Sequence, residues 1–165
     1  VLLFGSLPCT GGSAYQRINW HKSPATRMKI RQHRTVFDAL WRAFVTVAIA
    51  CRANGGSIAM EWPKGCSYWR ERKVKSFLAS MGMQQYHFDG CMYGLCSSAP
   101  KTLGVPLRKP WTVASNCNSF LRLCRTCNHP PSGHVKTQGV DTSRTESYTD
   151  PLVHKIHDCW RVACA

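Results

Sequence analysis

Long hydrophobic runs are absent from this sequence. No apolar stretch approaches the roughly 20 residues that a membrane-spanning helix needs, so we expect no membrane segment. A basic leader with a small-residue cleavage site is also missing, and the ten cysteines lie among aromatic and helix-like apolar segments. This context favours reduced thiols over a disulfide framework, and it predicts a reducing compartment, the cytoplasm or the nucleus.

Acidic residues are scarce as well. Only 8 residues are Asp or Glu, against 22 Lys and Arg, which leaves a net charge of +14. Such a surface attracts polyanions, and nucleic acid is the commonest polyanion in a cell, so DNA is the expected partner. Alternatively, the excess of basic residues only aids solubility, or it binds an acidic partner segment that is absent from this sequence. Because 44% of the residues are apolar and 18% charged, wholesale disorder is excluded.

Short apolar strands alternate with amphipathic helices along most of the chain. We expect strands at residues 1–4, 57–60, 84–89 and 111–114, and helices at 35–53, 68–80, 119–124 and 152–162. Residues 8–24 are rich in Gly, Ser and Pro and should form a mobile surface loop. The alternation is typical of an α/β fold with a partial open, mostly parallel sheet covered by helices. Reactive residues in such sheets lie just past the carboxyl ends of strands.

Two segments occupy such positions. Cys9 follows the first strand in a glycine-rich loop, where a thiol is partly exposed and therefore suited to nucleophilic chemistry. Glu61 follows the second strand, lodged between apolar residues and Trp62, where a partly desolvated carboxyl could share a proton with a substrate ring. Taken alone, each also fits a plain structural role, as a loop cysteine or as a salt-bridge carboxylate.

Together these segments resemble the DNA cytosine-5 methyltransferase family, over roughly residues 2–116. That family carries a Pro-Cys loop after one strand and a Glu-led motif after the next; here Pro8-Cys9 and Glu61 match, and Ser13 is similar to the small hydroxyl residue that often follows. The resemblance implies that Cys9 attacks C6 of a flipped-out cytosine, that Glu61 hydrogen-bonds its N3, and that S-adenosylmethionine donates the methyl group. Arg108 and Lys109 fall near the family's later basic motif and would bind the substrate.

The sequence departs from this family at several points. Thr10 stands where the family has Gln, Trp62-Pro63 follows the glutamate, and the later motif keeps only its basic character. The family's glycine-rich cofactor loop has no counterpart, so we expect a fragment or degenerate form of a Rossmann-like methyltransferase domain. An upstream segment or a second chain would have to supply the cofactor site.

Four metal-ligand residues gather in the C-terminal segment. Cys124, Cys127, His129 and His134 could complete a tetrahedral zinc shell, with Cys91 and Cys96 as alternative ligands. A polar loop that happens to hold two histidines is the rival interpretation. We therefore expect residues 1–118 to form the methyltransferase-like portion and residues 119–165 a basic, Cys/His-rich segment. The alternative function is a non-catalytic nucleic-acid-binding module stabilised by zinc.

Overall fold

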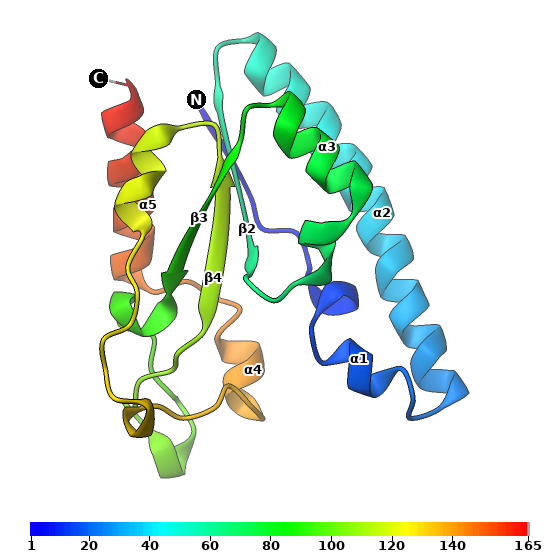
Figure 1. The fold of residues 1–165 in the computed structure, drawn as a ribbon, viewed down its shortest axis with the longest axis vertical. Helices are drawn as coiled ribbons and strands as arrows, with labels where there is room; N and C mark the ends of the chain where they lie inside the picture. Colours follow the sequence, from blue (N-terminus) through cyan, green and yellow to red (C-terminus); the bar gives the residue numbers. More distant parts are fainter. Residues whose placement is uncertain (165) are drawn as a thin grey trace. The chain divides into compact units, whose positions relative to one another are not determined.

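The computed structural model describes residues 1–164, without the side chains of Pro131 and Cys164. It confirms the predicted α/β class with an open sheet. The sheet is mixed and its strand order is β1-β2-β4-β3 (Figure 1). Its strands are β1 (Leu2–Gly5), β2 (Ser57–Pro63), β3 (Gln84–Asp89) and β4 (Pro110–Ser115). Strands β1 and β2 pair in parallel, with Leu2 opposite Ser57 and Gly5 opposite Met60.

The chain forms two compact units that interleave along the sequence. The first unit comprises Val1–Gln85 and Val113–Cys117, and the second comprises Tyr86–Thr112 and Asn118–Ala165. The division that we expected after residue 118 differs from this one, because Tyr86–Thr112 clusters with the C-terminal segment.

A strand–helix–strand motif organises the first unit. After β1, the chain passes through a short 3-10 helix, η1 (Thr10–Gly12), and α1 (Gln16–Asn19) into the long helix α2 (Pro24–Ala53), which leads back to β2 (Figure 1). Helix α2 begins eleven residues before the predicted start at residue 35. The reason is a capping arrangement: the Ser23 hydroxyl accepts a hydrogen bond from the Thr26 N–H, and Pro24 occupies the first helical turn.

Aromatic side chains fill the core of the first unit. Phe37 of α2 stacks on Tyr68 with 3.6 Å between ring centroids, and Trp41 meets Phe77 edge-on at 5.3 Å. Tyr68 lies in η2 (Ser67–Arg70) and Phe77 in α3 (Arg72–Ser80). Trp62 of β2 is buried, and its indole N–H donates a hydrogen bond to the Leu7 carbonyl at 2.8 Å. This core therefore anchors the segment that leads to Cys9.

Short helical turns make up much of the second unit, which ends in one longer helix. It contains η3 (Gly90–Tyr93), η4 (Pro100–Thr102), η5 (Asn118–Leu123), η6 (Pro131–Gly133), α4 (Val140–Arg144) and α5 (Asp150–Cys164). The Tyr93 hydroxyl donates a hydrogen bond to the Leu123 carbonyl at 2.8 Å, which ties η3 to η5. Buried Asp141 accepts hydrogen bonds from the Ser97 hydroxyl and the Ser98 N–H, at 2.7 and 2.8 Å.

The described helices include none that is long and apolar enough to cross a membrane. Within residues 1–164, even the 30-residue α2 lacks the continuous apolar length that crossing a bilayer requires. Each of the nine described cysteines carries a free thiol.

Candidate functional site

Cys9 and Glu61 both lie in the first unit, where the two parallel strands end. Cys9 comes four residues after the end of β1, immediately before η1, and packs half-buried against the aromatic core. Glu61 lies inside β2, directly after Met60, whose partner across the ladder is Gly5. Only 5% of the Glu61 surface is exposed. The parallel register thus brings the Cys9 segment and Glu61 to the same end of the two strands. Glu61 lies inside β2, which continues to Pro63, and not after the strand as the sequence predicted.

A third side chain at this edge, Cys66, was not anticipated from the sequence. Burial raises the pKa of the Cys66 thiol to about 12; a hydrogen bond with the Tyr68 backbone opposes this rise, and the negative charges of Cys9 and Glu61 add to it. Both residues therefore lie within electrostatic reach of the same buried sulfur. A thiol with so high a pKa stays protonated near neutral pH, so Cys66 is a poor nucleophile there. No spacing or neighbour in the sequence distinguishes Cys66 from the other cysteines.

The loop after Cys9 is held close to the core. A side chain at Gly12 would place its Cβ 2.8 Å from the Cys66 sulfur and 2.9 Å from the Tyr68 ring, so only glycine fits there. Residues 8–24, expected to be a mobile loop, in fact include η1 and α1. Pro8 is exposed and Ser13 is half-buried at the edge of a hollow in the first unit.

Arg108 and Lys109, the other expected substrate-binding residues, belong to the second unit and have local partners there. The Arg108 guanidinium lies 3.4 Å from a carboxylate oxygen of Asp89. The Lys109 ammonium donates a hydrogen bond to the Thr145 carbonyl at 2.5 Å and lies 5.2 Å from the centre of the Trp111 ring. Both cations therefore contribute to the packing of their own unit.

The second unit gathers four metal-ligand atoms in one place. The sulfurs of Cys91 and Cys127 and one ring nitrogen each of His129 and His134 all lie within 4.8 Å of one another. The Cys127 sulfur is 3.4 Å from Nδ1 of His129 and 3.3 Å from Nε2 of His134. Zn–S bonds of about 2.3 Å and Zn–N bonds of about 2.0 Å in a tetrahedron separate neighbouring ligand atoms by roughly 3.3–3.8 Å. This group could therefore hold a metal ion with little rearrangement.

Cys91 takes the place in this group that we expected for Cys124. The chain after η5 is fastened to the end of β3, because the Asp89 N–H donates to the Arg125 carbonyl at 3.0 Å and the Asp89 carboxylate accepts from the Cys127 N–H at 2.9 Å. These bonds bring Cys127 next to Cys91, which lies two residues beyond Asp89. Cys124 is exposed and outside the group. Cys96, the other alternative ligand, is also exposed and outside it.

The two sulfurs of this group interact directly. Burial raises the pKa of the Cys91 thiol to about 12, and its hydrogen bond to Cys127 and the charge on Cys127 raise it further. Two thiols and two imidazoles in contact form a donor set that suits a borderline-soft divalent ion, for which sulfur and nitrogen are preferred over carboxylate oxygen.

The chain was also compared with known proteins. No protein-family model, no curated protein and no solved structure matches it.

Proposed function

We propose that this chain carries the base-activating part of a DNA cytosine-5 methyltransferase, on a Rossmann-like α/β framework. The observation that carries the proposal is the parallel register of β1 and β2, which brings the Cys9 loop and Glu61 to one edge of the sheet. A thiol and a carboxyl placed together in this way suit addition to a nitrogenous ring whose charge must be neutralised.

In the proposed reaction the Cys9 thiolate forms a bond to C6 of a cytosine, and the electron pair of the C5–C6 double bond moves into the ring. Glu61 donates a hydrogen bond at N3, where negative charge develops. S-adenosylmethionine would supply the methyl group that C5 then takes up. Loss of the C5 proton to a base and departure of the Cys9 thiolate restore the aromatic ring.

Access to Glu61 sets a condition on this mechanism. Because only 5% of its surface is exposed, a base could meet the carboxyl only after the side chains that cover it move aside. The cytosine itself must leave the base stack, at a cost of a few kcal/mol, before its C6 can be attacked. The net charge of +14 favours the phosphate contacts that would offset this cost.

Covalent trapping tests the proposal. The chain is incubated with duplex DNA containing 5-azacytosine, with and without S-adenosylmethionine, and denatured before electrophoresis. We expect a denaturation-resistant adduct with the native chain and with the exposed-thiol control Cys96→Ser, but none with Cys9→Ser. No adduct from a chain that still binds the DNA would overturn the proposed chemistry, and the alternative of a non-catalytic basic module would then stand.

We propose separately that Cys91, Cys127, His129 and His134 bind one zinc ion with a structural role. The cluster supplies four protein ligands, whereas catalytic zinc sites keep one position open for water. Metal analysis after dialysis should give one zinc per chain. Cys91→Ser and Cys127→Ser should lose it, and Cys124→Ser should keep it; loss in Cys124→Ser and retention in Cys91→Ser would disprove this ligand set.

A further inference from the structure

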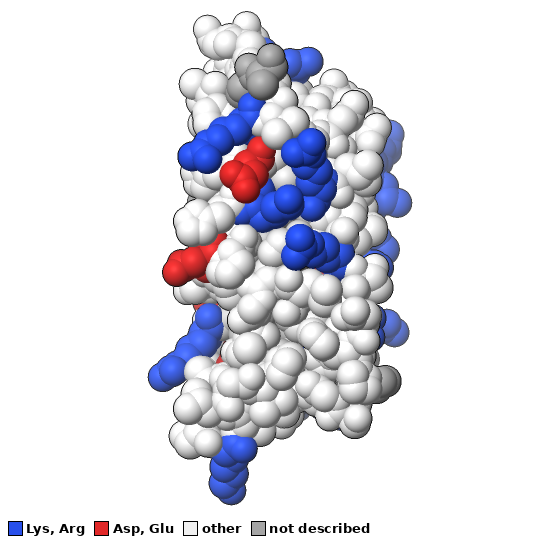
Figure 2. Space-filling model, turned by 90° about the vertical axis from the view of Figure 1, so that its left-hand side faces the viewer, with Lys and Arg blue, Asp and Glu red and all other residues white. Residues whose placement is uncertain are grey.

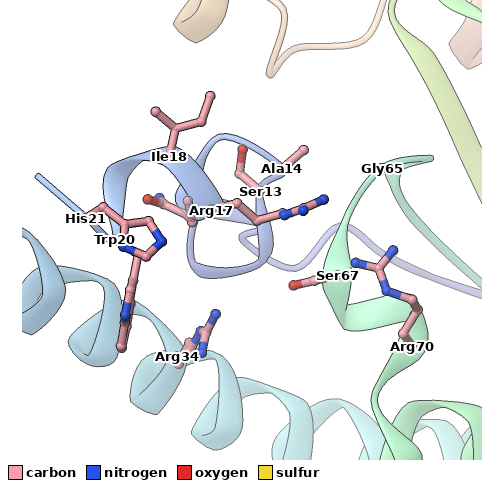
Figure 3. A pocket seen from close by; sticks show the side chains of 11 residues that line it. Ser13, Ala14, Arg17, Ile18, Trp20, His21, Arg34, Gly65, Ser67 and Arg70 are labelled. Carbon is pink, nitrogen blue, oxygen red and sulfur yellow. The ribbon is translucent and has the colours of Figure 1, made fainter.

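A hollow of about 900 Å³ opens in the first unit beside the Cys9 loop. Loop and α1 residues form one side of it, α2 another, and η2 a third (Figure 3). Its size is at the upper end for ligand sites, which is larger than a single phosphate needs. The hollow could therefore hold a ligand in which several phosphate-sized groups are linked in a chain.

Three arginines line this hollow, and none of the described residues that line it is acidic. Arg17 of α1, Arg34 of α2 and Arg70 of η2 extend toward the space between these elements, and Ser67 faces it from η2 (Figure 3). Guanidinium groups present paired N–H donors that match phosphate oxygens, and three of them lining one hollow favour a multiply charged anion.

Two contacts fix Arg34 in place. Its Nε donates a hydrogen bond to the Gly11 carbonyl at 3.3 Å, and its guanidinium lies 5.8 Å from the centre of the Trp20 ring. Arg31 lies over the same ring at 5.7 Å. A cation held by an aromatic ring and a carbonyl loses less conformational entropy when it binds an anion.

The hollow is continuous with the segment that carries Cys9. Arg34 bonds the Gly11 carbonyl, Gln16 donates through its amide to the Thr10 carbonyl at 2.8 Å, and Ser13 lines the hollow itself. A ligand seated among the arginines would therefore lie next to the loop that presents the thiol.

We propose that Arg17, Arg34 and Arg70 form a phosphate-binding site for the DNA strand whose base is presented to Cys9. This inference rests on the proposed function for the identity of the strand. The first unit as a whole supports a polyanionic ligand, because it carries 13 Lys and Arg against only Asp38, Glu61 and Glu71.

Salt-dependent binding tests the site. Binding of a fluorescent 20-base-pair duplex is followed by anisotropy between low and moderate salt, for the native chain and for the triple variant Arg17→Gln, Arg34→Gln, Arg70→Gln. Each lost phosphate contact lowers the slope of log K against log salt by about 0.9, so the triple variant should lose roughly 3. The double variant Arg17→Gln, Arg70→Gln, which keeps the Arg34 bond to Gly11, should lose roughly 2.

The matched control removes the same charge elsewhere in the first unit. Arg42→Gln, Arg52→Gln and Arg72→Gln are exposed and lie outside the hollow, so together they should change the slope by less than one. Equal losses in the two triple variants would show undirected attraction and overturn the site. Cys9→Ser should bind DNA normally. Failure of trapping would therefore count against the proposed chemistry and leave the arginine site intact.

Discussion

The two units of this protein are stabilised in different ways. The first unit has an aromatic core in which Phe37, Trp41 and Trp62 are each at least 96% buried. This unit also carries most of the net positive charge of the protein. The second unit also buries aromatic side chains, among them Phe88, Tyr93 and Trp111, and adds hydrogen-bonded carboxylates and the Cys/His group. On the side where α5 lies, acidic side chains are interspersed among the basic ones (Figure 2). Both units thus have a packed core, and we expect the proposed zinc to stabilise only the second.

Loss of the proposed zinc should produce the largest effect. Cys127→Ser removes a ligand that contacts both histidines, and structural zinc contributes on the order of 10 kcal/mol to small metal-dependent folds. We expect the second unit to lose its cooperative melting while the first keeps its own. Hydrogen exchange resolved by segment measures this, with Cys124→Ser as the control. Equal protection of the second unit in native and Cys127→Ser chains would contradict it.

Truncation of the aromatic core should destabilise the first unit and leave the second unit unaffected. Trp41→Ala should cost the first unit about 3–5 kcal/mol, because it leaves a cavity among Phe37, Phe44 and Phe77. Zinc content should stay unchanged. Chemical denaturation with metal analysis measures both quantities, and Leu40→Ala, more exposed on the same helix, should cost much less. Loss of zinc in Trp41→Ala would mean that the two units are not independent.

Acid should weaken the second unit through Asp141. Hydrogen bonds from the hydroxyl of Ser97 and the N–H of Ser98 hold the pKa of Asp141 below its ordinary value of 3.8. Its contribution to stability is therefore present above that ordinary value and is lost as the pH falls through the lowered pKa. Melting temperatures between pH 5 and pH 3 should fall less steeply in Asp141→Asn than in the native chain. Glu146→Gln, an exposed carboxylate in the same unit, should keep the native slope.

The smallest expected effect concerns the start of α2. Ser23→Ala removes the hydroxyl that accepts the Thr26 N–H, which should cost about 1 kcal/mol and fray the first turns. Protection of backbone amides near Thr26 measures this, and it should leave the second unit unaffected. Thr46→Ala, a mid-helix hydroxyl that bonds only the Arg42 carbonyl, should have little effect. A comparable loss in both variants would show that Ser23 does not act as a cap.

Local patterns predicted most of the elements. The strand at Gln84–Asp89 was predicted with its observed bounds, and the periodic apolar residues of α2 located its second half. The first third of α2 was missed because only Ile30 among its residues is buried, so hydrophobic spacing carries no signal there. Ser23-Pro24 is the signal for a helix start there, but the Gly, Ser and Pro content of residues 8–24 favours a loop.

The sequence predicts the Cys9–Glu61 site and the Cys/His group to different extents. That the Cys9 segment lies near β2 follows from strand order, because parallel neighbouring strands end at the same edge, whereas the catalytic roles of Cys9 and Glu61 stay predictions. Three of the four metal ligands are close in sequence, whereas Cys91 lies 36 residues before Cys127 and joins them through the bonds that Asp89 makes. A pairing of that kind depends on tertiary structure, which no spacing reveals. The arginines of the hollow come from three separate elements for the same reason.

The tight fit of Gly11 and Gly12 against the aromatic core has a consequence for comparing variants of this chain. A side chain at either position would collide with Tyr68, whether or not Cys9 reacts. Selection for folding alone would therefore preserve both glycines, even in copies that have lost the thiol. A related chain that keeps both glycines but has another residue in place of Cys9 would still fold and would lack the proposed chemistry. The residue at position 9, and not the loop around it, therefore reports on activity.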